Sequence, residues 1–427
     1  MTLQSSMSQR DCAANIFAEA IAAADPAVSL SRRLQSAPLP APKQGGRSIL
    51  IAIGKAAPAM MAEALQNVQG DHVALAVTHS ENQAVVPGAT VLNSAHPVPD
   101  ERGLKAGRQI IDLLSAAREQ DQIIALISGG GSALVPAPVD GLSLSDKIVV
   151  NELLLSSGLD IEHMNLVRQH LSQLKGGGFL RHGSPAPVTA YILSDVIGDD
   201  LRAVASGPTS PPIGTQADAR RICIGAGIWK RLPQSVRDHL EHSVPEQTIA
   251  VEATNHLIGS NTISLEAAHR CAAQFCRAEI ASKALTGDVS DAARQILQAA
   301  RSVASDRPVA LLFGGETTVR LQGAGLGGRN QELALRVAQL AQGEAIPGNW
   351  IFLSGGTDGR DGPTPAAGAI VDVGTFDRIR DAGQNPSTLL ANNDSHRALG
   401  LSGDLLMTGA TGTNVADIQV LLLGPDA

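Results

Sequence analysis

The chain has 427 residues, of which 44% are hydrophobic and only 2% aromatic, and its formal net charge is −8 at neutral pH. This length predicts roughly two or three domains, each large enough to bury a core of mainly aliphatic side chains. The acidic balance argues against a nucleic-acid-binding surface, and no segment approaches the ~20 apolar residues that a membrane-spanning helix needs.

The cysteines predict reduced thiols rather than a metal site or a disulfide framework. They are Cys12, Cys223, Cys271 and Cys276, and no two of them form a CxxC pair. These positions show neither the spacing of zinc ligands nor a regular disulfide pattern. The first residues also lack the basic segment and long apolar run of a secretory signal. We therefore expect a cytoplasmic protein with no membrane or nucleic-acid partner.

Strands and helices alternate through the first half of the chain. A helix is predicted at 11–24, and a linker rich in Pro and Gly follows at 36–46. Buried strands are predicted at 48–54, 72–79, 89–95, 123–127 and 187–200, the last of them running into an acidic loop. Helices are predicted at 55–65, 101–117, 143–155 and 160–174. A parallel, Rossmann-like sheet is the architecture that this alternation favours.

The alternation stops at a Pro/Gly cluster at 206–214 and restarts after residue 255. The segments that follow are predicted as a strand at 256–261, a helix at 262–275, a strand at 278–284, a helix at 288–304, a hairpin at 308–321, a helix at 331–341 and a strand at 350–354. We infer two α/β/α domains with mainly parallel sheets, at about 45–245 and 250–427. Residues 1–44 could pack on either domain, and we expect the active site in the cleft between the two.

Three predicted strands end in glycines that are followed by a hydroxyl side chain. They are QIIALISGGGSAL at 122–134, VALLFGGET at 309–317 and WIFLSGGTDG at 350–359. Glycines at a strand end let backbone N–H groups turn toward an anion, because no Cβ blocks the approach. Open α/β sheets bind ligands at the carboxyl ends of their strands. The pattern predicts one anion-binding site that includes Ser128, Gly129, Gly130, Gly131 and Ser132; three ordinary turns are the alternative.

Two cations and one histidine stand beside these loops. Lys55 follows the first strand and begins a helix. The helix N-terminus disfavours its positive charge unless a phosphate or carboxylate binds between them. His96 lies in the rigid turn HPVPD. Arg329 directly follows the glycine loop 323–328, and an arginine at such a place suits bidentate capture of a phosphoryl group. The alternatives are a solvated lysine for Lys55 and a turn histidine for His96.

Acidic residues close to the same loops suggest Mg²⁺, which takes one or two protein carboxylates and completes its shell with phosphate oxygens and water. Asp195 follows a buried strand and is the first candidate ligand, with Asp358 and Glu316 as alternatives. The alternative is a solvated acidic turn, which suits Asp199 and Asp200 better than Asp195. Asp195 or Asp358 could instead orient or accept the proton of a substrate hydroxyl, and the sequence does not separate these two roles.

The glycine loop GAGLGG at 323–328 formally fits the dinucleotide pattern GxGxxG. That fingerprint also requires an acidic residue at the end of the next strand. The next strand is Trp350–Ser354 and Glu344 precedes it, so the match is weak. The P-loop pattern GxxxxGK[ST] is absent from the chain, which means that a nucleotide site would be of another type.

The order of the motifs resembles that of the glycerate 2-kinase family, whose carboxyl-terminal part is called the MOFRL domain. The motifs are GKAAPAM, HPVPDE, SGGGSAL, SDVIGDDLRAVASGPT, GGETTV, GGRNQELAL, SGGTDGRDGPTPAAGA, NNDS and TGATGTNVAD. The resemblance spans residues from about 10 to 425. It implies ATP-dependent phosphorylation of D-glycerate at the 2-hydroxyl, with Mg²⁺. The family's proposed active-site lysine and arginine fall on Lys55 and Arg329.

The mechanism that we expect uses the glycine loops to hold the ATP phosphates through backbone N–H groups. Further binding residues are expected at His96, Gly327, Gly328, Asn330 and Thr357. Mg²⁺ would be held by Asp195, with Asp358 or Glu316 as alternatives, while Lys55 and Arg329 would neutralise charge on the reactants. The chain departs from the family pattern at Pro365, where an acidic residue is usual, and at His396, where an aromatic is frequent; both departures affect the expected substrate range.

Two other functions remain open on the sequence. An NAD(P)H-dependent hydroxypyruvate reductase would use GAGLGG, and a regulatory module that binds a sugar phosphate would use the glycine loops without turnover. Oxidation of NADH with hydroxypyruvate, or the absence of any turnover, would distinguish them from a kinase. The oligomeric state is not fixed by the sequence, and a homodimer is our working expectation.

Overall fold

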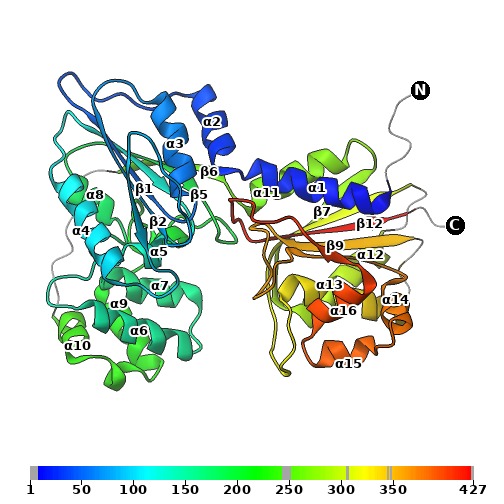
Figure 1. Cartoon of the computed structure of the whole chain (residues 1–427). Coiled ribbons are helices and arrows are strands. Elements are labelled where there is room, and N and C mark those ends of the chain that lie inside the picture. Colours follow the sequence, from blue (N-terminus) through cyan, green and yellow to red (C-terminus); the bar gives the residue numbers. More distant parts are fainter. Residues whose placement is uncertain (1–7, 243–251, 304–306, 344–345, 347–348, 425–427) are drawn as a thin grey trace. The chain divides into compact units, whose positions relative to one another are not determined.

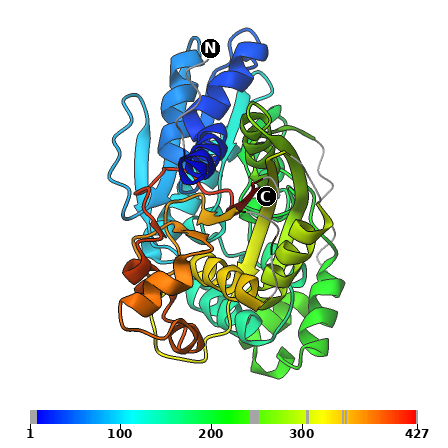
Figure 2. The same ribbon diagram turned by 90° about the vertical axis from the view of Figure 1, so that its right-hand side faces the viewer.

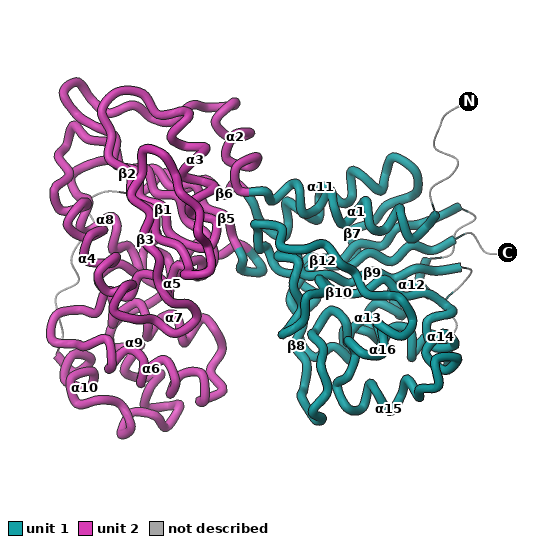
Figure 3. The backbone as a smooth tube through the Cα atoms, in the orientation of Figure 1, with its two compact units in different colours: residues 1–25, 195–198, 259–427 teal, residues 26–194, 199–258 magenta. Residues whose placement is uncertain are grey.

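The computed structural model of the chain describes residues 8–242, 252–303, 307–343, 346 and 349–424. The chain divides into two compact units (Figure 3). Unit 1 comprises residues 1–25, 195–198 and 259–427, and unit 2 comprises residues 26–194 and 199–258. No described helix combines the length and the apolarity that crossing a lipid bilayer requires.

Unit 2 is built on a six-stranded sheet whose strand order is β3-β2-β1-β4-β5-β6. The strands are β1 (Ser48–Ile53), β2 (His72–His79), β3 (Thr90–Ser94), β4 (Gln122–Ile127), β5 (Val188–Leu193) and β6 (Ala253–Gly259). The strands from β3 to β5 pair in parallel, and β1, β4 and β5 are buried along their whole length. Burial on both faces explains their continuous aliphatic sequences. The order 3-2-1-4-5 is that of doubly wound, nucleotide-binding sheets, as predicted.

The helices of unit 2 cover this sheet and form a second small core beside it. They are α2 (Pro26–Ser36), α3 (Ala57–Asn67), α4 (Glu101–Ser115), α5 (Gly131–Leu134), α6 (Leu144–Ser156), α7 (Ile161–His170), α8 (Gly178–Gly183), α9 (Gln216–Gly225) and α10 (Gln234–Glu241), with 3₁₀ turns η1 (Val204–Ser206) and η2 (Trp229–Arg231). Side chains that accept backbone N–H bonds fix several starts: Asp100 caps α4, Ser143 caps α6 and Asp160 caps α7. Aliphatic side chains of α6, α7, α9 and α10 pack together in the second core.

Unit 1 is built on a second six-stranded sheet with the order β11-β10-β9-β12-β8-β7. Its strands are β7 (Arg277–Asp288), β8 (Val309–Thr318), β9 (Trp350–Gly356), β10 (Gly368–Asp372), β11 (Leu405–Leu406) and β12 (Asp417–Leu423). Among the described pairings of this sheet only β7 with β8 is parallel. The expectation of a mainly parallel sheet is therefore wrong here, because β12, the last strand of the chain, lies between β8 and β9 and runs antiparallel to both.

Two further differences from the predicted elements concern strands. The predicted hairpin at 308–321 is the single strand β8, whose two neighbours in the sheet are β12 and β7. The strand β6 belongs to the sheet of unit 2, although it falls inside the predicted second domain at 250–427. In both places the apolar pattern indicates that a segment is buried in a sheet, but it does not indicate which strand pairs with it.

Helices cover both faces of the sheet in unit 1. They are α1 (Gln9–Ala23), α11 (Asn261–Ala272), α12 (Val289–Ser302), α13 (Arg329–Gly343), α14 (Thr375–Asp381), α15 (Pro386–Ala391) and α16 (Ser395–Ser402). Figures 1 and 2 show α1 and α11 on one face of this sheet and α12 to α16 on the other. The helix α1 buries Ile16 and Phe17 in the core formed with α11 and the sheet.

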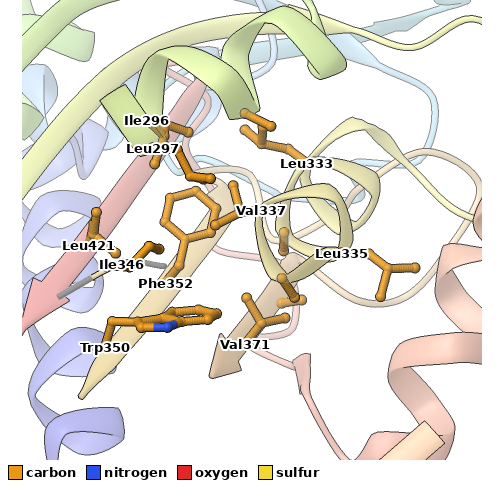
Figure 4. Packing of buried hydrophobic residues seen from close by; sticks show 14 of the residues in the cluster. Ile296, Leu297, Leu333, Leu335, Val337, Ile346, Trp350, Phe352, Val371 and Leu421 are labelled. Carbon is orange, nitrogen blue, oxygen red and sulfur yellow. The ribbon is translucent and has the colours of Figure 1, made fainter. Parts of the chain in front are cut away.

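The larger core of unit 1 lies between the sheet and α12 and α13, and Phe352 is fully buried in it (Figure 4). Truncating such a side chain removes its burial and leaves a cavity. We predict that Phe352→Ala lowers the free energy of unfolding by about 3–5 kcal/mol. Val373→Ala, at a residue that is 66% exposed, should change it by about 0.5 kcal/mol at most. Urea unfolding of both variants measures the difference, and similar values for the two would contradict this description of the core.

Candidate active site

The glycine loop of unit 2, residues 128–132, joins β4 to the short helix α5. Ser128 anchors it: its N–H donates to the Ile53 carbonyl at 2.9 Å, and its Oγ accepts the Ala56 N–H at 3.1 Å. The N–H groups of residues 129–132 donate to no residue within the described ranges. Four successive free backbone donors in a glycine-rich turn are an arrangement that suits an anion, and anion binding by this loop stays a prediction.

Lys55 and His96 lie against this loop. The Lys55 N–H donates to the Gly129 carbonyl at 2.9 Å, which ties the end of β1 to the loop. Gly130 has φ +82°, and a Cβ at this position would lie 3.3 Å from His96 Nε2 and 3.3 Å from Lys55 Cγ. A larger residue than glycine would therefore be strained and would also press on both side chains. The structure brings Lys55, His96 and the glycine loop together, as the sequence analysis expected.

The charges around the loop are predominantly positive. Burial, and then the positive charge of Lys55 and the nearby His79, lower the pKa of His96, while Glu81 acts in the opposite direction. The imidazole is therefore neutral at pH 7, because its ordinary pKa is about 6.5 and the shift is downward. The side chains of Lys55 and the neutral His96 therefore lie against a loop with four free N–H donors, an arrangement that favours an anionic ligand.

This arrangement predicts the direction in which substitutions move the pKa of His96. Lys55→Met removes a positive charge that disfavours the imidazolium, so the pKa of His96 should rise. Glu81→Gln removes a negative charge that favours the imidazolium, so the pKa of His96 should fall. An NMR titration of the His96 ring in both variants checks this pair of opposite shifts. An unchanged pKa in Lys55→Met would show that the ammonium does not face the imidazole.

Sequence reasoning missed Lys175, which also reaches this loop. Its side chain is buried, and its Nζ donates a hydrogen bond of 2.5 Å to Ser132 Oγ. Ser132 Oγ also lies 3.1 Å from Ser206 Oγ, on η1. The signal in the sequence is the segment LKGGG at 174–178, in which a lysine at the end of a predicted helix is followed by three glycines.

Unit 1 has an ion pair of its own at the start of α13. Arg329 donates from Nε to Asp417 Oδ2 at 2.7 Å and from Nη2 to Asp417 Oδ1 at 3.0 Å, and its Nη1 lies 2.7 Å from Glu316 Oε1. The Asp417 side chain is fully buried, whereas that of Arg329 is 34% exposed. Burial alone would lower the pKa of Arg329, but the hydrogen bonds and charge of Asp417, with the charge of Glu316, raise it above its usual range. The guanidinium is therefore charged, held in one orientation, and open to solvent on one side.

A second buried carboxylate fixes the backbone around Arg329. Asp361 accepts the N–H groups of Asn330 and Gln331 at 3.0 and 2.8 Å, and with them the Gln331 side-chain amide at 3.0 Å. Asn330 is buried and accepts a hydrogen bond of 2.6 Å from Ser354, and His396 contacts Gln331 through its Nδ1 at 2.9 Å. These bonds position the first turn of α13; a contact of Asn330 with ligand stays a prediction.

The loop GAGLGG differs from the glycine loop of unit 2 because most of its N–H groups are used. Those of residues 323–326 donate to the backbone or side chains of Asn392, Asn393 and Asp394. A Cβ at Gly323, Gly325 or Gly327 would collide with this segment, residues 392–395. Its glycines allow close packing, and these four donors face protein rather than a pyrophosphate. Gly327 and Gly328 directly precede Arg329, and their contact with a ligand stays a prediction.

The predicted acidic residues occupy different environments. In unit 1, Glu316 is paired with Arg329. Asp358 accepts the Arg360 N–H at 3.0 Å. Asp358 also lies near Asp417, because a Cβ built on Gly356 would be within 3.6 Å of both carboxylates. Thr357 is buried and donates to the Ala416 carbonyl at 2.6 Å. Asp195 follows β5, and Asp200 is paired with Arg202 at 2.7 Å. Within the described residues, no three His, Cys, Asp or Glu side chains gather as a metal cluster.

A family model described as a domain of unknown function (DUF4147) matches residues 12–241, and the MOFRL family model matches residues 309–417. The chain is 41% identical to a D-glycerate 2-kinase of Thermotoga maritima, over 88% of this chain and 91% of that protein. The chain belongs to the glycerate 2-kinase family. The two domain models cover the glycine loop and Arg329, respectively.

The fold agrees with this assignment. A crystal structure of a glycerate kinase from Thermotoga maritima matches the chain with a TM-score of 0.87 and 38% identity, over 97% of this chain and 99% of that one. A protein of Agrobacterium vitis named putative hydroxypyruvate reductase is also 38% identical, over 98% of this chain and 95% of its own length. Relatives of this glycerate 2-kinase family member therefore carry two different enzyme names. The two glycine loops, at 128–132 and 323–328, are the features whose geometry distinguishes the two activities.

Proposed function

We propose that the chain phosphorylates D-glycerate at the 2-hydroxyl with ATP, giving 2-phosphoglycerate and ADP. The observation that carries this proposal is the set of four N–H donors at residues 129–132, beside Lys55 and at the carboxyl end of β4. Donors of this kind bind phosphate oxygens, and they lie where doubly wound sheets hold nucleotides. The D-glycerate 2-kinase name of the Thermotoga maritima relative supports the choice of acceptor.

Each cation has a proposed role in charge neutralisation. Phosphoryl transfer depends on positioning and on stabilising the charge that spreads over the transferred group. Lys55 would neutralise phosphate charge at the glycine loop of unit 2, and His96, neutral and beside Gly130, would donate a hydrogen bond to the same ligand. Arg329 would use the N–H donors that Asp417 and Glu316 leave free to bind the transferring phosphoryl group or the carboxylate of glycerate.

The predicted acidic side chains fit a magnesium ion by their chemistry. Asp358 uses one carboxylate oxygen to accept the Arg360 N–H, and its other oxygen bonds no residue within the described ranges. Hard carboxylate oxygens are the donors that Mg²⁺ prefers, and it needs only one or two from the protein. We propose Asp195 as its ligand, with Asp358 as the alternative and Glu316 as a weaker candidate because it is paired with Arg329. When bound, the ion would supply charge neutralisation at the phosphates.

A carboxylate would also activate the hydroxyl group of glycerate that accepts the phosphoryl group. The 2-hydroxyl of glycerate loses its proton during transfer, so a group that accepts a hydrogen bond from it improves the nucleophile. Asp195 and Asp358 are the candidates for this role, and whichever of them does not bind the metal would take it. The other possible function, reduction of hydroxypyruvate with NAD(P)H, loses support because the N–H groups of residues 323–326 are occupied.

One coupled assay separates the two activities. The purified chain is given ATP, Mg²⁺ and D-glycerate, and ADP release is followed; in parallel it is given NADH and hydroxypyruvate, and NADH loss is followed. We expect D-glycerate-dependent ADP release and no NADH oxidation. NADH oxidation without ADP release would replace the kinase by the reductase, and neither activity would favour a sugar-phosphate-binding module. Size-exclusion chromatography with light scattering tests the expected homodimer in the same preparation.

A further inference from the structure

The buried lysine behind the glycine loop has no counter-charge. Lys175 is 6% exposed, and its Nζ donates a hydrogen bond to the hydroxyl of Ser132 at 2.5 Å. Within the described residues no carboxylate pairs with it, and the charges that act on it are those of Lys147 and Arg168, both positive. Burying an ammonium without an anion is unfavourable by several kcal/mol, so an unpaired lysine at this depth requires a reason.

The surroundings of Lys175 hold its hydrogen-bond partner in place. Ser132 Oγ is also 3.1 Å from Ser206 Oγ, and Ser206 donates to the buried Asn165 Oδ1 at 3.3 Å. The Lys147 ammonium is turned to the Leu171 carbonyl at 3.2 Å, and Arg168 donates to Asn151 Oδ1 at 2.5 Å. Three basic side chains therefore interact electrostatically in this region, and each has a neutral oxygen atom as its hydrogen-bond partner.

We propose that Lys175 and Ser132, together with the N–H groups of residues 129–131, form an oxyanion site. The bound anion is then the counter-charge that the Lys175 ammonium otherwise lacks. This inference deepens the proposed kinase function, on which its choice of ligands rests. Two reactants could provide the oxyanion, namely a phosphate of the nucleotide and the carboxylate of glycerate. Ser132 is partly exposed and belongs to the same loop as the four free N–H donors, so one anion could contact both sets of groups.

The proposal predicts that binding is coupled to protonation. Burial, and then the charges of Lys147 and Arg168, hold the pKa of Lys175 well below its ordinary value. A bound oxyanion favours the ammonium and raises that pKa. Between the two pKa values the site takes up a proton on binding, and affinity falls by up to about tenfold for each unit of rising pH. His96 beside this loop and His79, which interacts electrostatically with Lys55, also have lowered pKa values, so their contribution must be separated.

Calorimetry at pH 8, in buffers of different ionisation enthalpy, measures the proton uptake directly. ADP and D-glycerate are titrated separately into the wild type, Lys175→Met and Lys175→Gln. Methionine replaces a buried charge by an apolar side chain of similar length, which proteins often tolerate, and glutamine keeps a hydrogen-bond donor toward Ser132. Lys230→Met, at an exposed lysine of unit 2, is the matched control and should behave as the wild type.

We expect the wild type to take up more protons than either Lys175 variant in at least one titration, and both variants to bind that ligand about tenfold or more weakly. Uptake with ADP identifies the phosphate as the oxyanion, and uptake with D-glycerate identifies the carboxylate. Equal uptake in the wild type and the variants, or no uptake with either ligand, would overturn the proposal. Kinase activity of the wild type is measured separately, so the proposed function and this inference can fail independently.

Discussion

Arg329→Ala should lower kcat/KM for D-glycerate phosphorylation by about 10³-fold or more. An arginine that stabilises the charge of a transferring phosphoryl group contributes on this scale. The effect has two sources, because the substitution also leaves the buried Asp417 carboxylate without its partner. Breaking a buried ion pair from one side destabilises a protein by about 3–5 kcal/mol. Steady-state kinetics and urea unfolding of the same preparation therefore have to be measured together.

The double variant Arg329→Met with Asp417→Asn separates the two sources. It removes the guanidinium without leaving a buried charge, so it should recover much of the stability while kcat/KM stays low. Arg336→Ala is the matched control, since Arg336 forms an ion pair with the buried Glu332 on the same helix α13. It should lose stability but little activity. A loss of less than about tenfold in a folded Arg329 variant would remove this arginine from the proposed site.

Lys55→Met should lower kcat/KM by about 10²–10³-fold with little change in stability. The lysine stem packs against Gly130, and methionine preserves most of that contact while removing the ammonium. Removing one preorganised group that stabilises developing charge costs on this order in rate. If the ammonium acts mainly in the transition state, the loss appears in kcat; if it binds substrate and transition state equally, the loss appears in KM.

The control for Lys55 is another lysine of unit 2 that lies outside the glycine loop. Lys105 is exposed on α4, and Lys105→Met should leave both kcat and KM within about twofold of the wild type. Kinetics for ATP and for D-glycerate, each varied at saturation of the other, show which reactant the ammonium serves. Wild-type kinetics in Lys55→Met would contradict its assignment to the phosphate-binding loop.

The sequence predicts much of unit 2 because its signals are local. The apolar run Ile123–Ile127 predicts a buried strand, and the glycines after it predict a turn that only small residues allow. The structure has both. The parallel pairing from β3 to β5 follows because alternating strands and helices favour it. Lys55 and His96 were found for the same reason: each directly follows a predicted strand.

What the sequence analysis missed depends on contacts between distant segments. Asp417, the bidentate partner of Arg329, lies 88 residues away from it in the chain, within the buried strand β12. The direction of β12 was not predicted, since an apolar strand buried on both faces has the same sequence pattern in either orientation. Lys175 belonged to no recognised motif, and its burial against Ser132 emerges only when η1 and α5 are brought together.

The central claim, phosphoryl transfer from ATP to the 2-hydroxyl of glycerate, is tested most directly by ³¹P NMR of the reaction mixture. Incubation of the chain with ATP, Mg²⁺ and D-glycerate should produce one new phosphomonoester resonance, split by a single proton as expected for phosphate on a secondary carbon, together with the resonances of ADP. A phosphomonoester coupled to two protons would place the phosphate on the primary hydroxyl. Unchanged ATP would contradict the kinase altogether.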